Sequence, residues 1–160
     1  MCAILEGRSV ATTMGFSTAD GLVMGTRTGS IDPGVLVARM RDDQLSLDQL
    51  EDLLYRRSGL LGLSGISPDM RVLLASDRPE AREAVDYYCY SAARHAASLA
   101  PALGGLDAIV FTGGVGENAA PVRAKILAHL AWLKVPASHV HIVPADEERT
   151  IARDVTSLLG

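Results

Sequence analysis

The sequence is poor in cysteine and contains no long apolar run. Its two cysteines, Cys2 and Cys89, are too few and too far apart for a disulfide framework or a structural zinc site. We expect each of them to be a small buried hydrophobic residue. No apolar stretch approaches the ~20 residues of a membrane span, and the start, MCAILEGRS, lacks the basic and apolar regions of a secretory signal. The sequence therefore predicts a cytoplasmic protein that does not bind a membrane.

A basic excess is also missing. The formal net charge of −4 argues against a protein that binds nucleic acid without regard to the base sequence. An apolar content of 48% and a charged content of 21% are ordinary for a globular chain, and 160 residues suffice for one domain with its own core. His139 and His141 would face the same side of a strand, but they have no third ligand in view, so a metal pair is the lesser alternative.

The stretch LDAIVFTGGVGEN, residues 106–118, organises the chain. Its apolar run 108–112 is too short for a core helix, and it predicts a strand buried on both faces. Three of the next four residues are glycines, which let backbone N–H groups approach a ligand closely, and a helical pattern follows. A strand, a glycine turn and a helix start are typical of a phosphate or nucleotide site. A tight turn in which glycine only relieves strain is the alternative.

Patterning along the chain predicts the remaining elements. A hairpin around Gly7 joins strands at 3–5 and 9–13, and a long loop covers 14–33. Helices are expected at about 33–41, 46–57, 69–76, 79–99 and 119–133 and after Asp146, a strand at 140–143, and a glycine-serine loop in SGLLGLSGISPDMR. The helix that Ser46 caps should bury Leu47, Leu50, Leu53 and Leu54.

Three charged residues allow both a functional and a structural explanation. Arg27, between Gly25 and Gly29, is suited to hold phosphate or carboxylate with its guanidinium fork, or to bind loop carbonyls. Asp69 is in a position to cap the short helix that follows it. Glu147 lies in the first turn of the last helix, where an acidic residue interacts favourably with the helix dipole.

The glycine motif does not fit the common phosphate loops. No Lys-Ser/Thr pair follows it, so it is not a P-loop. Gly114 to Ala119 fits the loose dinucleotide-binding form GxGxxA, but the ribose-binding acid expected about 20 residues further on is missing. The next acid after the predicted strand is Asp146, about 30 residues beyond Gly116. A stand-alone NAD-type module therefore remains an alternative.

Four segments in order carry a family resemblance: SVATTMGFSTADGLVMGTRTGSIDP, SGLLGLSGISPDMR, LDAIVFTGGVGEN and VPADEERTIARD. With them the whole chain resembles the C-terminal half of the acetate/propionate kinase family, in the sugar kinase, Hsp70 and actin superfamily. The resemblance implies an α/β fold, namely a ribonuclease H-like domain of the actin-like ATPase superfamily, with a mixed sheet and flanking helices. Residues 1–160 would be the nucleotide-binding domain, without its first strand and without the N-terminal domain.

The resemblance also implies roles for individual residues. Adenosine of ATP or ADP would be held by Gly114, Val115, Gly116, Glu117 and Asn118, while Asp69, Met70 and Arg71 would line the nucleotide cleft. Arg27 matches the arginine that grips the transferred phosphoryl group, and Glu147 matches a glutamate associated with Mg²⁺. The family usually has acidic residues at positions 11 and 30, and asparagine at 146. This chain has Ala11, Ser30 and Asp146 there, which puts the fine geometry of the loop in question.

The implied reaction is reversible transfer of the γ-phosphoryl group of ATP to acetate or another short carboxylate, in a homodimer. The family's catalytic histidine, a second arginine and the carboxylate pocket belong to its N-terminal half. We therefore expect the 160 residues alone to bind adenine nucleotide weakly and to turn over little or no substrate. A non-catalytic interaction domain with the same fold is a further alternative.

Overall fold

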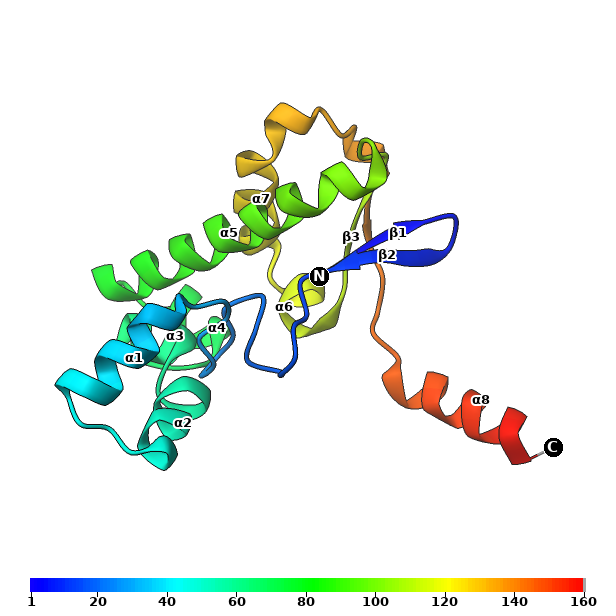
Figure 1. Ribbon diagram of the computed structural model, residues 1–160. Helices are drawn as coiled ribbons and strands as arrows, with labels where there is room; N and C mark the ends of the chain where they lie inside the picture. The colour runs from blue at the N-terminus through cyan, green and yellow to red at the C-terminus, as the bar shows by residue number, and fades with distance from the viewer. Residues whose placement is uncertain (160) are drawn as a thin grey trace.

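The computed structural model describes residues 1–159, except the side chain of Glu147. Two strand pairs are combined with helices, as Figure 1 shows. The strands are β1 Cys2–Leu5, β2 Arg8–Thr12, β3 Ile109–Phe111 and β4 Val140–Ile142. The helices are α1 Pro33–Asp42, α2 Leu47–Arg56, α3 Gly59–Ser64, α4 Met70–Leu74, α5 Pro79–Leu99, α6 Gly113–Asn118, α7 Ala120–His129 and α8 Glu147–Leu159, with 3₁₀ turns at Ala100–Leu103, Ala131–Leu133 and Ala137–His139.

Within the described residues, the strands form two separate two-stranded sheets rather than the expected mixed sheet. The predicted hairpin is confirmed: β1 and β2 pair antiparallel, and Glu6 and Gly7 have the positive φ angles of a two-residue hairpin turn, 50° and 75°. The second sheet pairs β3 with β4 in parallel, from Ile109 opposite Val140 to Phe111 opposite Ile142. A parallel pair places the carboxyl ends of both strands at one edge.

Strand β3 is not buried on both faces, contrary to the sequence prediction. Ile109 and Phe111 pack against the core, but Val110 is 55% exposed. Successive side chains of a strand point to opposite faces, and here only one face of β3 is covered by the core. The apolar run therefore describes a half-buried strand.

Helix α5 is the centre of the core. It contacts α3, α4 and α7, and its buried face contains Ala81, Ala84, Ala92 and Ala93. Such small residues let neighbouring helices approach closely. Cys89 on the same face is buried as predicted, and burial raises the pKa of its thiol to about 11. Cys2 is exposed, because it lies on a hairpin strand with little cover, so the prediction for that cysteine was wrong.

Two further sequence predictions need correction. The glycine-serine segment contains a helix, α3, in which Leu60 is buried, the Ser64 hydroxyl donates to the Leu60 carbonyl at 2.7 Å, and Gly65 ends the helix with a positive φ. Tertiary burial outweighs the low helix propensity of glycine here. In α2, Leu50 is buried but Leu47 is 71% exposed, because the first residue of that helix lies beyond the packed region.

Helix α8 projects away from the other helices in Figure 1. Asp146 caps it as predicted, since the backbone N–H of Arg149 donates to Asp146 Oδ1 at 3.1 Å. Apolar residues of α8, including Ile151 and Leu158, are exposed. Among residues 1–159 the structure contains no helix that combines the length and the apolar character needed to cross a membrane.

Candidate functional site

The glycine stretch forms a short helix rather than a turn. Gly113 has a φ of 74°, which lets the chain leave β3 and enter α6 directly. At Gly114, which is exposed, an added Cβ would meet no atom within 4 Å. At Gly116 it would lie 3.5 Å from the carbonyl carbon of Phe111, an ordinary contact. The backbone at Gly114 is therefore open on its outer side.

Three side chains fasten α6. Glu117 Oε1 accepts hydrogen bonds from the N–H of Gly113 at 2.7 Å and of Ala145 at 2.8 Å. The amide nitrogen of Asn118 donates to the Gly114 carbonyl at 2.9 Å. Arg123 Nη1 donates to two carbonyls near the end of α6, that of Gly116 at 2.9 Å and that of Glu117 at 2.8 Å. No motif indicated the role of Arg123, because it depends on how α7 packs beside α6.

Asp69, Met70 and Arg71 form the start of α4. Asp69 caps the helix, accepting from the Arg71 N–H at 2.9 Å, and its carboxylate also pairs with the Arg71 guanidinium at 2.6 Å. The hydrogen bond from the Arg71 side chain is the main cause that lowers the pKa of Asp69. Met70 is buried in the core, with 4% of its surface exposed. Of the three, Arg71 has the side chain that reaches into solvent, 87% exposed.

One hydrophobic cluster joins these two segments. Met70 of α4 belongs to it, and Val115 of α6 packs against it. Arg27 takes part neither in this cluster nor in the hydrogen bonds around α6. The structure thus ties two of the predicted groups to a common core, while Arg27 belongs to a separate loop.

The loop that contains Arg27 is anchored through its backbone. The Leu60 N–H donates to the Met24 carbonyl at 2.8 Å, and the Ser58 N–H donates to the Thr26 carbonyl at 2.9 Å. The guanidinium of Arg27 makes one long hydrogen bond, from Nη1 to the Thr18 carbonyl at 3.4 Å. Arg27 is therefore a half-buried arginine on a fixed backbone, with most of its donor groups not used by that contact.

Asp20 is a loop residue that sequence reasoning missed. Its Oδ1 accepts from the Ser30 hydroxyl at 2.7 Å and from the Gly21 N–H at 2.7 Å. These two hydrogen bonds, that from Ser30 first, lower the pKa of Asp20. A serine at position 30 can donate to Asp20, whereas a carboxylate there would repel it. Ser30, where the family usually has an acidic residue, thus has a hydrogen-bonding role within the loop.

The residues predicted as metal ligands, Glu147 and the alternative pair His139 and His141, all lie in the C-terminal part of the chain. The side chain of Glu147 lies outside the described part of the structure. Among the remaining side chains, no group of three or more His, Cys, Asp or Glu residues is arranged to hold a metal ion. His139 contacts the Asp107 carbonyl through Nδ1 at 2.9 Å.

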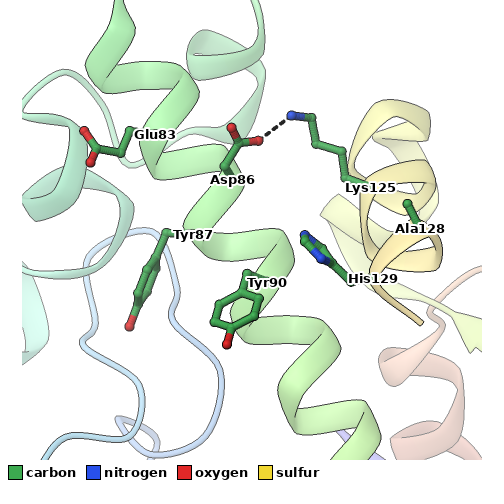
Figure 2. A pocket seen from close by; sticks show the side chains of 7 residues that line it. All are labelled: Glu83, Asp86, Tyr87, Tyr90, Lys125, Ala128 and His129. Carbon is green, nitrogen blue, oxygen red and sulfur yellow. Dashed lines mark hydrogen bonds and ion pairs between the residues drawn. The ribbon is translucent and has the colours of Figure 1, made fainter. Parts of the chain in front are cut away.

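A surface pocket of about 550 Å³ lies between α5 and α7, and Figure 2 shows the side chains around it. Tyr90 and His129 meet edge to face with ring centroids 5.7 Å apart, and Lys125 pairs with Asp86. The other lining residues are Glu83, Tyr87 and Ala128. None of the residues predicted for the nucleotide site lines this pocket.

The α/β architecture fits an actin-like ATPase fold: the acetate kinase of Porphyromonas gingivalis superimposes with a TM-score of 0.90 at 32% identity, over 99% of this chain and 46% of that one. A propionate kinase from Francisella tularensis gives a TM-score of 0.84 at 32% identity, over 92% and 43%. A model of the Acetokinase family matches residues 1–157. The chain belongs to the Acetokinase family.

Relatives found by sequence support the same family assignment. The acetate kinase of Rhodopseudomonas palustris is 49% identical over an alignment of 178 positions, which covers 99% of this chain and 45% of the relative. The acetate kinase of Rickettsia akari is 40% identical, over 99% and 46%. The chain thus spans about half the length of the curated relatives it matches. Since the first alignment is longer than 160 residues, that relative has residues in this region that the chain lacks. These kinases give no support to the NAD-type module.

Proposed function

We propose that the chain is the nucleotide-binding half of a reversible carboxylate kinase. The whole enzyme would transfer the γ-phosphoryl group of ATP to acetate or another short carboxylate, which yields an acyl phosphate and ADP. The observation that carries the proposal is the Acetokinase family match over residues 1–157. The named relatives include acetate kinases and a propionate kinase, so the proposal leaves the choice between these acceptors open.

Adenosine is assigned to the segment from Gly114 to Asn118. The exposed backbone at Gly114, beside which an added Cβ would find only open space, suits a flat ring system. The Gly113 N–H already donates to Glu117, so that donor does not serve a phosphate. Among Asp69, Met70 and Arg71 at the start of α4, Arg71 has the most exposed charged side chain. The proposal therefore concerns adenosine binding rather than a phosphate cradle.

Phosphoryl transfer spreads negative charge over the equatorial oxygens, and it needs positioning and cationic stabilisation more than covalent help. Arg27 would contribute the cation of this chain, on the backbone anchored by α3. Mg²⁺, when bound with ATP, would be a second cation beside the phosphates, in addition to Arg27. Its assignment to Glu147 rests on the family resemblance.

Ligand-induced thermal shifts test the nucleotide assignment. We expect Mg-ADP or Mg-ATP at ten times its dissociation constant to stabilise the chain by about 1.4 kcal/mol, because binding to the folded state alone shifts the unfolding equilibrium. For a domain of this size that raises Tm by roughly 3–6 °C. Stabilisation by NAD instead would support the dinucleotide module, and no response to either ligand would support a non-catalytic interaction domain.

Trapping of acyl phosphate by hydroxylamine tests whether the 160-residue chain alone catalyses the proposed reaction. We expect the 160-residue chain with Mg-ATP and acetate to give no product above background, because the carboxylate pocket is assigned to the half it does not contain. The full-length acetate kinase of Rhodopseudomonas palustris is the positive control. Robust ATP-dependent product from the purified chain would contradict this part of the proposal.

The proposal includes a homodimer and a cytoplasmic location, without nucleic acid or membrane as a partner. The exposed tyrosines Tyr87 and Tyr90 on α5 support a contact surface, since aromatic side chains are enriched at protein interfaces. Both line the pocket between α5 and α7.

A further inference from the structure

We infer that Glu117 is a positioning residue, whose carboxylate holds α6 and the segment that leads into α8 in one arrangement instead of contacting the nucleotide. The inference rests on the proposed function, because that function assigns adenosine to α6. It departs from the family-based prediction, in which Glu117 itself contacts adenosine.

Backbone pairing between β3 and β4 ends just before the residues that donate hydrogen bonds to Glu117. Its last hydrogen bond runs from the Val143 N–H to the Phe111 carbonyl, at 2.9 Å. Two residues further along each strand, the chains diverge toward α6 and α8. There the N–H groups of Gly113 and Ala145 both donate to one oxygen, Glu117 Oε1, at 2.7 and 2.8 Å. The carboxylate thus continues the link between the strands where backbone pairing has stopped.

A carboxylate suits this position. Both bonds are charge-assisted, and such bonds are stronger than those between neutral groups. At the other end of α6, the Arg123 guanidinium donates to the carbonyls of Gly116 and Glu117. The helix therefore has an anion bonded at its start and a cation at its end, the arrangement that its dipole favours.

Helix α6 depends on such contacts. It has six residues, three of which are glycines, and a helix this short and glycine-rich is not stable by itself. Ala145 lies two residues before Glu147, where α8 begins. The carboxylate of Glu117 consequently couples the adenosine segment to the part of the chain that is assigned to Mg²⁺, and leaves Gly114 and Asn118 exposed.

Amide hydrogen exchange measured by NMR on the 160-residue chain tests the link without any ligand. In Glu117→Ala we expect the amides of Gly113 and Ala145 to exchange at least tenfold faster, and to do so together. In Glu117→Gln both should stay protected within about threefold, because the amide oxygen can accept the same two bonds. Glu51→Ala, at an exposed position on α2, is the matched control. Unchanged protection in Glu117→Ala, or loss at only one of the two amides, would overturn the inference.

Titration with Mg-ADP separates positioning from contact. A positioning role predicts at least a tenfold higher dissociation constant for Glu117→Ala, and a value within about threefold of the parent for Glu117→Gln. Equal weakening in both variants, with the amides of Glu117→Gln still protected, would mean that the charge contacts the ligand, and would overturn the inference. If the parent chain does not bind Mg-ADP, the proposed function fails and the exchange result alone decides on the link. Should Glu117→Ala not fold, Glu117→Asp replaces it, since its shorter side chain cannot reach both N–H groups.

Discussion

Replacing Gly59 by alanine is expected to lower the free energy of unfolding by about 2–5 kcal/mol, from backbone strain and overpacking together. Gly59 has a φ of 62°, and a Cβ there would lie 2.2 Å from the Met24 carbonyl oxygen and 2.8 Å from that of Arg27. Backbone atoms cannot move aside as the end of a flexible side chain can. Urea denaturation followed by circular dichroism measures the loss.

Gly65→Ala separates the two causes. Gly65 has nearly the same φ, 61°, but a Cβ added there would meet no atom within 4 Å. Only the left-handed backbone is then penalised, by about 1–2 kcal/mol. Equal losses for the two variants would mean that the close approach at Gly59 contributes nothing.

Gly59 matters for the proposed function because it contacts the loop that contains Arg27. The same backbone segment, from Met24 to Arg27, presents the arginine assigned to the phosphoryl group. Relief of the clash would require this segment to shift, and with it Arg27. Packing of α3 therefore determines where the proposed cationic group lies.

Helix ends were predictable because their signals are local. Pro33 and Pro79 begin α1 and α5, and Asp69 caps α4. Ser46 forms a reciprocal capping box with Gln49 at the start of α2. Each of these effects acts within one helical turn, so the sequence alone contains it.

Features that depend on distant residues were not predictable in this way. Helix α3 forms in a glycine-rich segment because burial of Leu60 compensates for weak propensity. Glu117 accepts a hydrogen bond from Ala145, 28 residues away, because the pairing of β3 with β4 brings the two segments together. For the site, the sequence indicated Arg27 and the glycine segment with Glu117 and Asn118. The hydrogen bonds by which Glu117 and Arg123 hold that segment depend on tertiary structure.

Gly114→Ala is expected to change stability and affinity in opposite directions. Gly114 lies within α6, and a Cβ there would meet no atom within 4 Å. Alanine should therefore stabilise the fold by about 0.5–1 kcal/mol through its lower entropy in the unfolded chain. If adenosine lies against this backbone, the new methyl group occupies its place, and the dissociation constant of Mg-ADP should rise at least tenfold, equivalent to about 1.4 kcal/mol.

Calorimetric titration and urea denaturation of the same protein measure both effects of Gly114→Ala. Gly105→Ala is the matched control, because it also adds a methyl group in open space on an exposed backbone, outside the proposed site. Unchanged affinity in Gly114→Ala would remove adenosine from this face of α6. Loss of affinity together with gained stability is the more informative result, since no folding defect can then explain the weaker binding. Glycine at position 114 would then be present for the ligand, because nothing in the packing around α6 requires it.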